Sequence, residues 1–158
     1  MNAFIRATAC AVLTTILAAI LTAMAACSLV NPPPVIAGAA AVPLLDTHWR
    51  LVQLGGEMVD NPAGESDAHI VLSSASNAVT GNSGCNRIFG HYALENDMLK
   101  FDGLGGTKMA CAARMQLEQS FNNALMSVLR WKINGRTLEL LDETGQAVLT
   151  LEATPATG

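Results

Sequence analysis

The sequence predicts a mainly β domain of the α+β class, a curled or closed antiparallel meander of about seven or eight strands with one inserted helix. Short runs of alternating apolar and polar residues recur from Asp46 onward, and turn residues separate them. This pattern is typical of antiparallel strands. At about residues 112–129 the apolar residues instead recur every three or four positions, which is typical of an amphipathic helix.

The strand-like runs are punctuated by residues that favour tight turns. Gly55-Gly56 ends the first run, since glycine tolerates turn conformations without steric cost. The strongest hairpin signal is Asn134-Gly135, for which we expect a type I′ turn with positive φ at both positions. The predicted strands are residues 48–54, 69–73, 78–81, 87–94, 98–101, 130–133, 136–141 and 146–152.

The predicted helix has one apolar face. Leu117, Phe121, Ala124, Leu125 and Val128 lie on it, and glutamine and asparagine residues lie opposite. We expect this stripe to pack on the sheet and to cover an opening or one edge of it. About 107 residues of this kind suffice for one independent hydrophobic core.

The first 26 residues differ in composition from the rest of the chain. Twenty of them are apolar, and Arg6 is the only charge before Asp46. A basic start, an apolar stretch and small residues at the end indicate a secretory signal peptide at residues 1–26, although an uncleaved membrane anchor has a similar length. The remaining 132 residues are about 45% apolar, an ordinary value for a globular domain.

Residues 24–27, Met-Ala-Ala-Cys, resemble a bacterial lipobox, with methionine where the pattern usually has leucine. The resemblance implies lipidation of Cys27, and Ser28 after it implies sorting to the outer membrane, facing the periplasm. Several acyl chains would anchor the protein stably, so the membrane is its first expected partner. Residues 27–45 are rich in proline and alanine and uncharged, and we expect a tether before a domain at 46–152 and a disordered tail at 153–158.

Two cysteines remain for the exported domain, because Cys10 lies in the signal peptide and Cys27 would be lipidated. In an oxidising compartment, Cys85 and Cys111 favour a disulfide over free thiols. A metal site or a redox pair is the alternative, but no Cys-x-x-Cys motif is present, and the three histidines have no metal-ligand spacing. We therefore expect a disulfide, no metal and no cofactor. The net charge of −4 gives no reason to expect nucleic-acid binding.

Two cysteine motifs and two shorter patterns between them resemble the META domain family, which includes the bacterial heat-shock protein HslJ. The resemblance covers residues 47–151. It implies a β-rich domain with one helix, a link to heat shock and to tolerance of novobiocin, and no catalytic residues, since none are established for the family. The matching patterns are Gly81-x-Ser83-Gly84-Cys85-Asn86-Arg87, Gly90-x-Tyr92, Leu99-x-Phe101 and Thr107-Lys108-Met109-Ala110-Cys111.

The motif residues have a structural interpretation and a binding interpretation. Ser83, Gly84 and Asn86 are typical of a turn beside a cysteine. Asn86 is expected to bond backbone groups of the loop that carries Thr107, which would bring the two cysteines together. Under the second interpretation the motifs form a binding site, in which Arg87 and Lys108 could hold an anion, unless they form a solvated pair.

Motifs that would indicate catalysis are incomplete. Residues 81–85 begin like a nucleophile elbow but end in cysteine instead of glycine. Residues 103–108 begin like a dinucleotide loop, but Lys108 occupies the last glycine position.

We therefore expect a non-enzymatic envelope lipoprotein that supports stress or antibiotic tolerance by binding an envelope protein or a small apolar ligand. A ligand site would need a cavity of a few hundred Å³ between sheet and helix, not filled by the aromatic side chains there. The alternative is an inhibitor of a periplasmic hydrolase such as lysozyme, with a protruding loop at residues 57–67.

Overall fold

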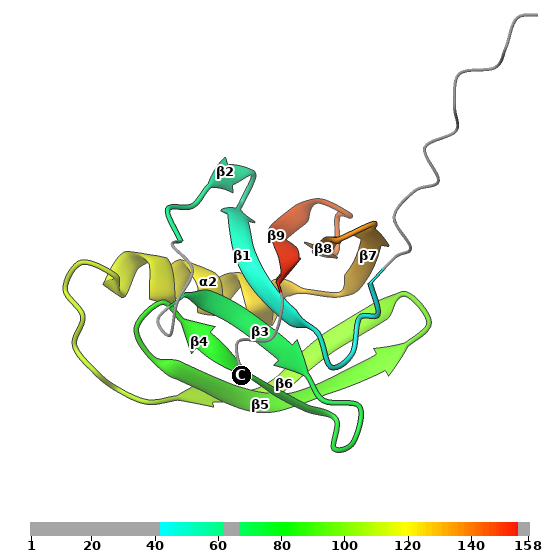
Figure 1. Ribbon diagram of the computed structural model, residues 1–158, viewed down its shortest axis with the longest axis horizontal. Coiled ribbons are helices and arrows are strands. Elements are labelled where there is room, and N and C mark those ends of the chain that lie inside the picture. Colours follow the sequence, from blue (N-terminus) through cyan, green and yellow to red (C-terminus); the bar gives the residue numbers. More distant parts are fainter. Residues whose placement is uncertain (1–41, 62–66, 155–158) are drawn as a thin grey trace, which may run out of the picture. The chain divides into compact units, whose positions relative to one another are not determined.

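The computed structural model describes residues 42–61 and 67–154, in which nine antiparallel strands form one sheet that closes on itself (Figure 1). Strand β1 pairs with β3 on one side and with β9 on the other, which closes the barrel. The predicted mainly β fold with one helix is confirmed, and the meander is closed. The strands are β1 (His48–Leu54), β2 (Glu57–Met58), β3 (Ala68–Leu72), β4 (Ala78–Ser83), β5 (Arg87–Glu95), β6 (Met98–Gly106), β7 (Arg130–Asn134), β8 (Thr137–Leu141) and β9 (Ala147–Thr154).

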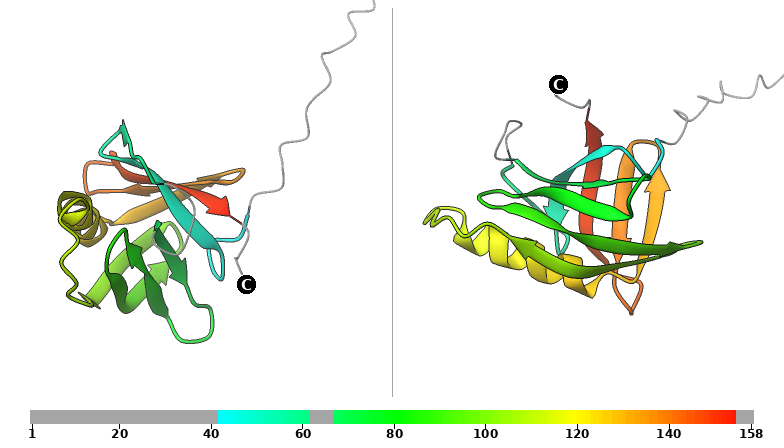
Figure 2. Two further views of the ribbon diagram at one scale, coloured as in Figure 1. Left: turned by 60° about the vertical axis from the view of Figure 1, so that its left-hand side comes forward. Right: turned by 90° about the horizontal axis from the view of Figure 1, so that it is seen from below.

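The helix α2 (Met115–Ser127) covers the weakest seam of the barrel. Within the described residues, β6 and β7 pair only at Met98 and Arg130. The left view of Figure 2 looks nearly along α2 and shows it beside the two curved layers of strands. Phe121 and Leu125 on the helix are fully buried. The apolar stripe therefore closes the barrel interior where strand pairing is sparse, as the sequence predicted.

Large side chains fill the barrel interior. Trp49 and Phe121 are both fully buried, and the indole Nε1 of Trp49 donates a hydrogen bond of 2.8 Å to the carbonyl of Leu44. Phe101 and Trp131 pack against this core from partly exposed positions. In the described part of the chain, large apolar side chains therefore occupy the centre of the barrel.

One turn differs from its predicted type. The Asn134-Gly135 hairpin forms, but the type I′ prediction is wrong, because Asn134 still pairs with Thr137 and Gly135 is the first turn residue, with φ of +60°. Its neighbour Arg136 has no positive φ, a pattern typical of a type II′ turn. Positive φ at both central positions occurs instead at Gly55 and Gly56. This turn creates the short strand β2, which the sequence did not predict.

Strand β6 continues to Gly106, five residues beyond its predicted end. Its last part lies so close to β5 that a Cβ on Gly106 would be 2.6 Å from the carbonyl oxygen of Arg87. Glycine permits this approach. Helix α2, in turn, begins at Met115 instead of residue 112, because residues 112–114 form a turn after Cys111.

The domain extends beyond residues 46–152 at both ends. Val42 donates a backbone hydrogen bond of 3.0 Å to Gly135, Leu44 is buried, and β9 reaches Thr154. Residues 42–45 of the expected tether are thus part of the domain. The predicted signal peptide at residues 1–26, Cys27, residues 28–41 of the expected tether and residues 155–158 lie outside the described residues. No helix in the part of the chain that the structure describes is long and apolar enough to cross a membrane.

Candidate functional site

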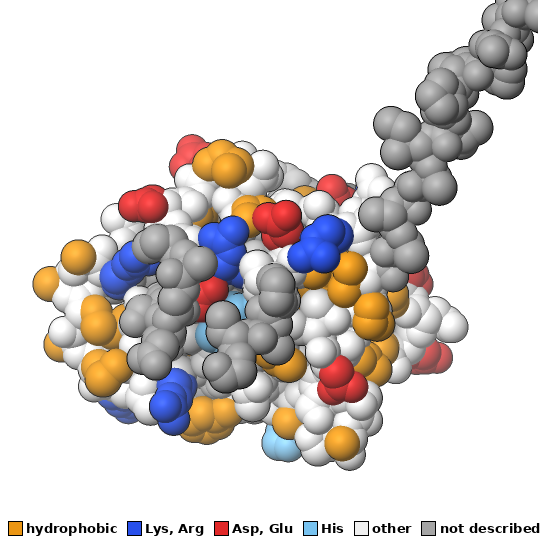
Figure 3. Space-filling model, in the orientation of Figure 1, with side chains coloured by type: hydrophobic (Ala, Val, Ile, Leu, Met, Phe, Trp, Pro, Cys, Tyr) orange, Lys and Arg blue, Asp and Glu red, His pale blue; other side chains and the backbone are white. Residues whose placement is uncertain are grey.

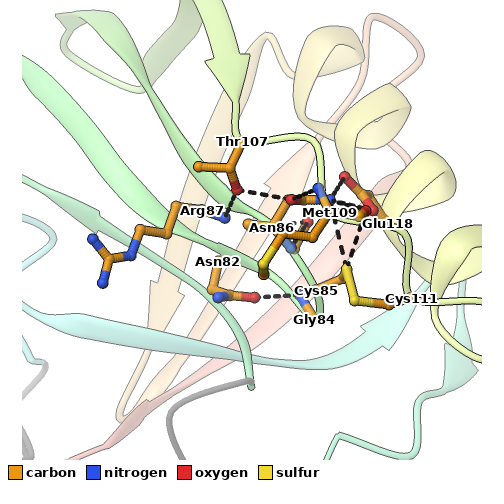
Figure 4. Close-up of a disulfide and its surroundings, with 10 residues drawn as sticks. Asn82, Gly84, Cys85, Asn86, Arg87, Thr107, Met109, Cys111 and Glu118 are labelled. Carbon is orange, nitrogen blue, oxygen red and sulfur yellow. Dashed lines mark hydrogen bonds between the residues drawn. A yellow bond between two sulfur atoms is a disulfide. The ribbon is translucent and has the colours of Figure 1, made fainter.

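A disulfide fixes the segment between β6 and α2 to the turn between β4 and β5. Cys85 and Cys111 are bonded, with their Cα atoms 6.0 Å apart (Figure 4). We call residues 107–114 the strap, because they cross from the end of β6 to the start of α2. The bond places the two cysteine motifs side by side.

Asn86 joins the strap to the barrel and to the helix. Its side chain is buried, and its Oδ1 accepts hydrogen bonds of 2.7 Å from the Thr107 hydroxyl and from the Met109 amide. Its Nδ2 donates to the Met109 carbonyl at 3.1 Å and to the Glu118 carboxylate at 2.9 Å. The amide thus uses its acceptor and both donors (Figure 4). The contact between Asn86 and the loop of Thr107 and Met109 is the one expected from the sequence.

The other motif residues shape the turn that presents Asn86. The Ser83 hydroxyl donates to the carbonyl of Asn86 at 3.0 Å, and Gly84 has φ of +94°, which favours glycine. The Gly84 amide donates to Asn82 Oδ1 at 2.7 Å. The backbone N–H of Arg87 donates to the Thr107 hydroxyl at 3.1 Å. These residues therefore stabilise the turn between β4 and β5 and its contact with Thr107.

Two adjacent hollows lie between the strap, the end of β6 and α2. The first measures about 340 Å³ and the second, more open one about 620 Å³. Exposed methionines border these hollows: Met126 lines the first, and Met109 and Met115 line the second. Figure 3 shows further hydrophobic side chains on other parts of the surface. Four residues line both hollows: Thr107, Lys108, Glu118 and Asn122.

The two predicted basic residues have different surroundings. Lys108 lines both hollows, whereas Arg87 is exposed and is not among the described residues that line either one. An anion site shared by the two side chains therefore has no support. Glu118 and Asn122 were not predicted as site residues. Both lie beside the apolar stripe of the helix, one turn apart, and are half-buried.

A second polar cluster lies on the outer face of β1 and β3. His48 and His69 stack with their ring centroids 4.1 Å apart, and Asp67 Oδ1 lies 2.9 Å from His69 Nδ1. Burial, and then the nearby charge of His69, lowers the pKa of His48 although Asp67 opposes this effect. The imidazole of His48 is therefore neutral at pH 7. No short motif predicts this cluster, because 20 residues separate the two histidines.

Comparison with known proteins identifies the family of this chain. The sequence profile of the META domain matches residues 42–155, which include both cysteine motifs and the strap. The chain belongs to the META domain family. No curated protein matches it.

Two solved structures share the fold of this META-domain protein. An NMR structure of a protein from Burkholderia xenovorans is 34% identical, covers 70% of this chain and 83% of its own, and has a TM-score of 0.57. A second NMR structure is 21% identical, covers 73% of this chain and 95% of its own, and has a TM-score of 0.56. The similarity to the second structure supports a shared fold alone.

Proposed function

We propose that this META-domain protein is a non-catalytic lipoprotein of the cell envelope that binds a small, largely apolar molecule between β6 and α2. Binding would support tolerance of envelope stress and of antibiotics of the novobiocin type. The observation that carries this proposal is the hollow of about 340 Å³ beside the strap. Its volume lies within the usual range of small-molecule sites, about 300–1,000 Å³.

The walls of the hollow suit a ligand with an apolar body and one polar end. Ile88, Leu104 and Leu125 contribute apolar surface, and Lys108 and Asn122 contribute polar groups. The disulfide and the Asn86 hydrogen bonds hold the strap side of the hollow in place before any ligand arrives. A wall that is ordered in advance lowers the entropic cost of binding.

The reactive groups nearest the hollow are already engaged in structure. Both cysteine sulfurs are in the disulfide, and both carboxylate oxygens of Glu118 lie within 3.0 Å of Asn86 Nδ2. A cysteine acts as a nucleophile only as a free thiol, and a carboxylate that accepts hydrogen bonds is a weaker general base. This arrangement favours binding over catalysis.

The anchor in this proposal depends on Cys27. We expect protein extracted from membranes to have an intact mass that corresponds to loss of residues 1–26 plus the acyl groups. The Cys27→Ser variant should lack this mass and leave the membrane fraction or remain unprocessed, whereas Cys10→Ser should behave as wild type, since Cys10 would be removed. Membrane-extracted wild-type protein that begins at Met1, or at a free Ser28, would contradict lipidation.

The hollow can be tested with two exposed methionines. Met126 borders the hollow and is 65% exposed, whereas Met58 lies on β2 and is 75% exposed. We expect Met126→Asp to weaken binding of the apolar dye anilinonaphthalene sulfonate by about tenfold, since a charge replaces an apolar contact. Met58→Asp, which has the same net charge, should bind the dye as wild type does. Fluorescence titration measures both.

The same pair of variants tests the cellular role. In a strain that lacks the protein, wild type and Met58→Asp should restore growth in novobiocin, whereas Met126→Asp should not. Equal dye binding by all three proteins would exclude the hollow as the ligand site. If Met126→Asp fails to restore growth while no dye binds even to wild type, this surface instead contacts an envelope protein.

A further inference from the structure

We propose that His48, Asp67 and His69 form a binding site for a divalent transition-metal ion such as Zn²⁺. The three residues each offer a ligand atom, and these atoms all lie within 4.8 Å of one another. Two imidazoles and a carboxylate are ligands that Zn²⁺ and its neighbours favour. The site lies on β1 and β3, away from the strap, and is independent of the function proposed above.

Strand pairing brings the two histidines together. His48 is the first residue of β1 and His69 the second residue of β3, and the antiparallel register pairs Trp49 with Ile70. Because Trp49 and Ile70 are fully buried in the core, alternation along each strand directs both imidazoles to the outer face. The barrel thus fixes the backbone positions of both ligands.

Hydrogen bonds orient the two rings in the way common for metal-binding histidines. His48 Nδ1 lies 2.7 Å from the Thr154 hydroxyl, and His69 Nδ1 lies 2.9 Å from both the carbonyl and Oδ1 of Asp67. When Thr154 holds Nδ1 of His48, Nε2 of this ring is free to bind the metal. A metal between His69 Nδ1 and Asp67 Oδ1 would take the place of the proton that these two atoms share, so His48 Nε2, His69 Nδ1 and Asp67 Oδ1 are the expected ligands.

The buried carboxylate is the second argument for a cation. Asp67 is only 5% exposed, and its ion-pair partner among the described residues is His69. Arg50 lies on the same face of β1, but its Nη1 donates to the carbonyl of Asn61 at 2.7 Å. A divalent ion would compensate the negative charge of this buried carboxylate. Ligand atoms around tetrahedral Zn²⁺ lie about 3.3 Å apart, so side-chain rotation would complete the site.

Calorimetric titration of full-length protein, purified in detergent without a histidine tag, measures binding of Zn²⁺ itself. We expect about one ion per chain. His48→Ala and His69→Ala should each weaken the affinity by at least about tenfold, the lower range for loss of even an outer partner of a metal ligand. The control is His91→Ala, which removes the exposed histidine of β5 and should bind Zn²⁺ as wild type does. Met126→Asp should also bind Zn²⁺ normally, whatever its effect on dye binding.

A measurement on wild-type protein guards against misfolded variants. In ¹⁵N spectra of the imidazoles, Zn²⁺ should shift the ring-nitrogen signals of His48 and His69 and leave those of His91 in place. The proposal is overturned if Zn²⁺ shifts neither histidine, or if the double variant His48→Ala and His69→Ala binds Zn²⁺ as tightly as wild type does.

Discussion

Replacing both Cys85 and Cys111 with serine should lower the free energy of unfolding by about 3.5 kcal/mol. The disulfide spans 26 residues, and without it the unfolded chain regains the entropy that this closed loop removes. The strap also loses its covalent attachment to the turn between β4 and β5. Urea unfolding of the variant and of wild type measures the difference.

A chemical control separates loss of the bond from the effect of serine itself. Reductant should destabilise wild type by a similar amount and leave the double variant unchanged. Cys10→Ser, which removes a cysteine outside the domain, should unfold as wild type does. A stability change below about 1 kcal/mol in the double variant, with no effect of reductant on wild type, would show that the bond contributes little.

Local sequence patterns predicted most strands because each side of this sheet has a distinct environment. Trp49 and Leu51 alternate with partly exposed residues along β1, so period-two patterning was readable from the chain. Such alternation could not predict the glycine-rich end of β6. Its glycines serve a close approach to β5, and a glycine-rich run without its partner strand looks like a loop. The same limit applies to the turn at Gly135, whose type depends on the register of β7 and β8.

The candidate site was only partly predictable for a similar reason. The link from Asn86 to the strap could be inferred because both cysteine motifs lie close together in sequence and a disulfide would join them. The contact with Glu118 depends on where α2 docks, which local patterning does not specify. The hollow depends on the same docking. His48 and His69 meet only through the pairing of β1 with β3, and no short motif encodes that pairing.

Asn86→Ala should destabilise the domain by about 2–4 kcal/mol, since it leaves several partly buried groups without partners. The Met109 amide and carbonyl lose their hydrogen bonds to the Asn86 side chain, and the Glu118 carboxylate loses a donor that lies at 2.9 Å. Urea unfolding measures the loss. Asn82→Ala is the matched control in the same turn, because Asn82 accepts a single hydrogen bond, from the Gly84 amide. Its expected cost is about 1 kcal/mol.

A double-mutant cycle can show that Asn86 acts by holding the helix as well as the strap. Asn86→Ala and Glu118→Ala should be non-additive, with a coupling of about 1.5–3 kcal/mol, the usual value for a hydrogen bond to a charged group. Asn86→Ala and Gln119→Ala should be additive, since Gln119 is exposed on the next helical position. If the first cycle were additive too, Asn86 would stabilise the strap alone. The position of α2, and with it the helical wall of the hollow, would then depend on the packing of Phe121 and Leu125.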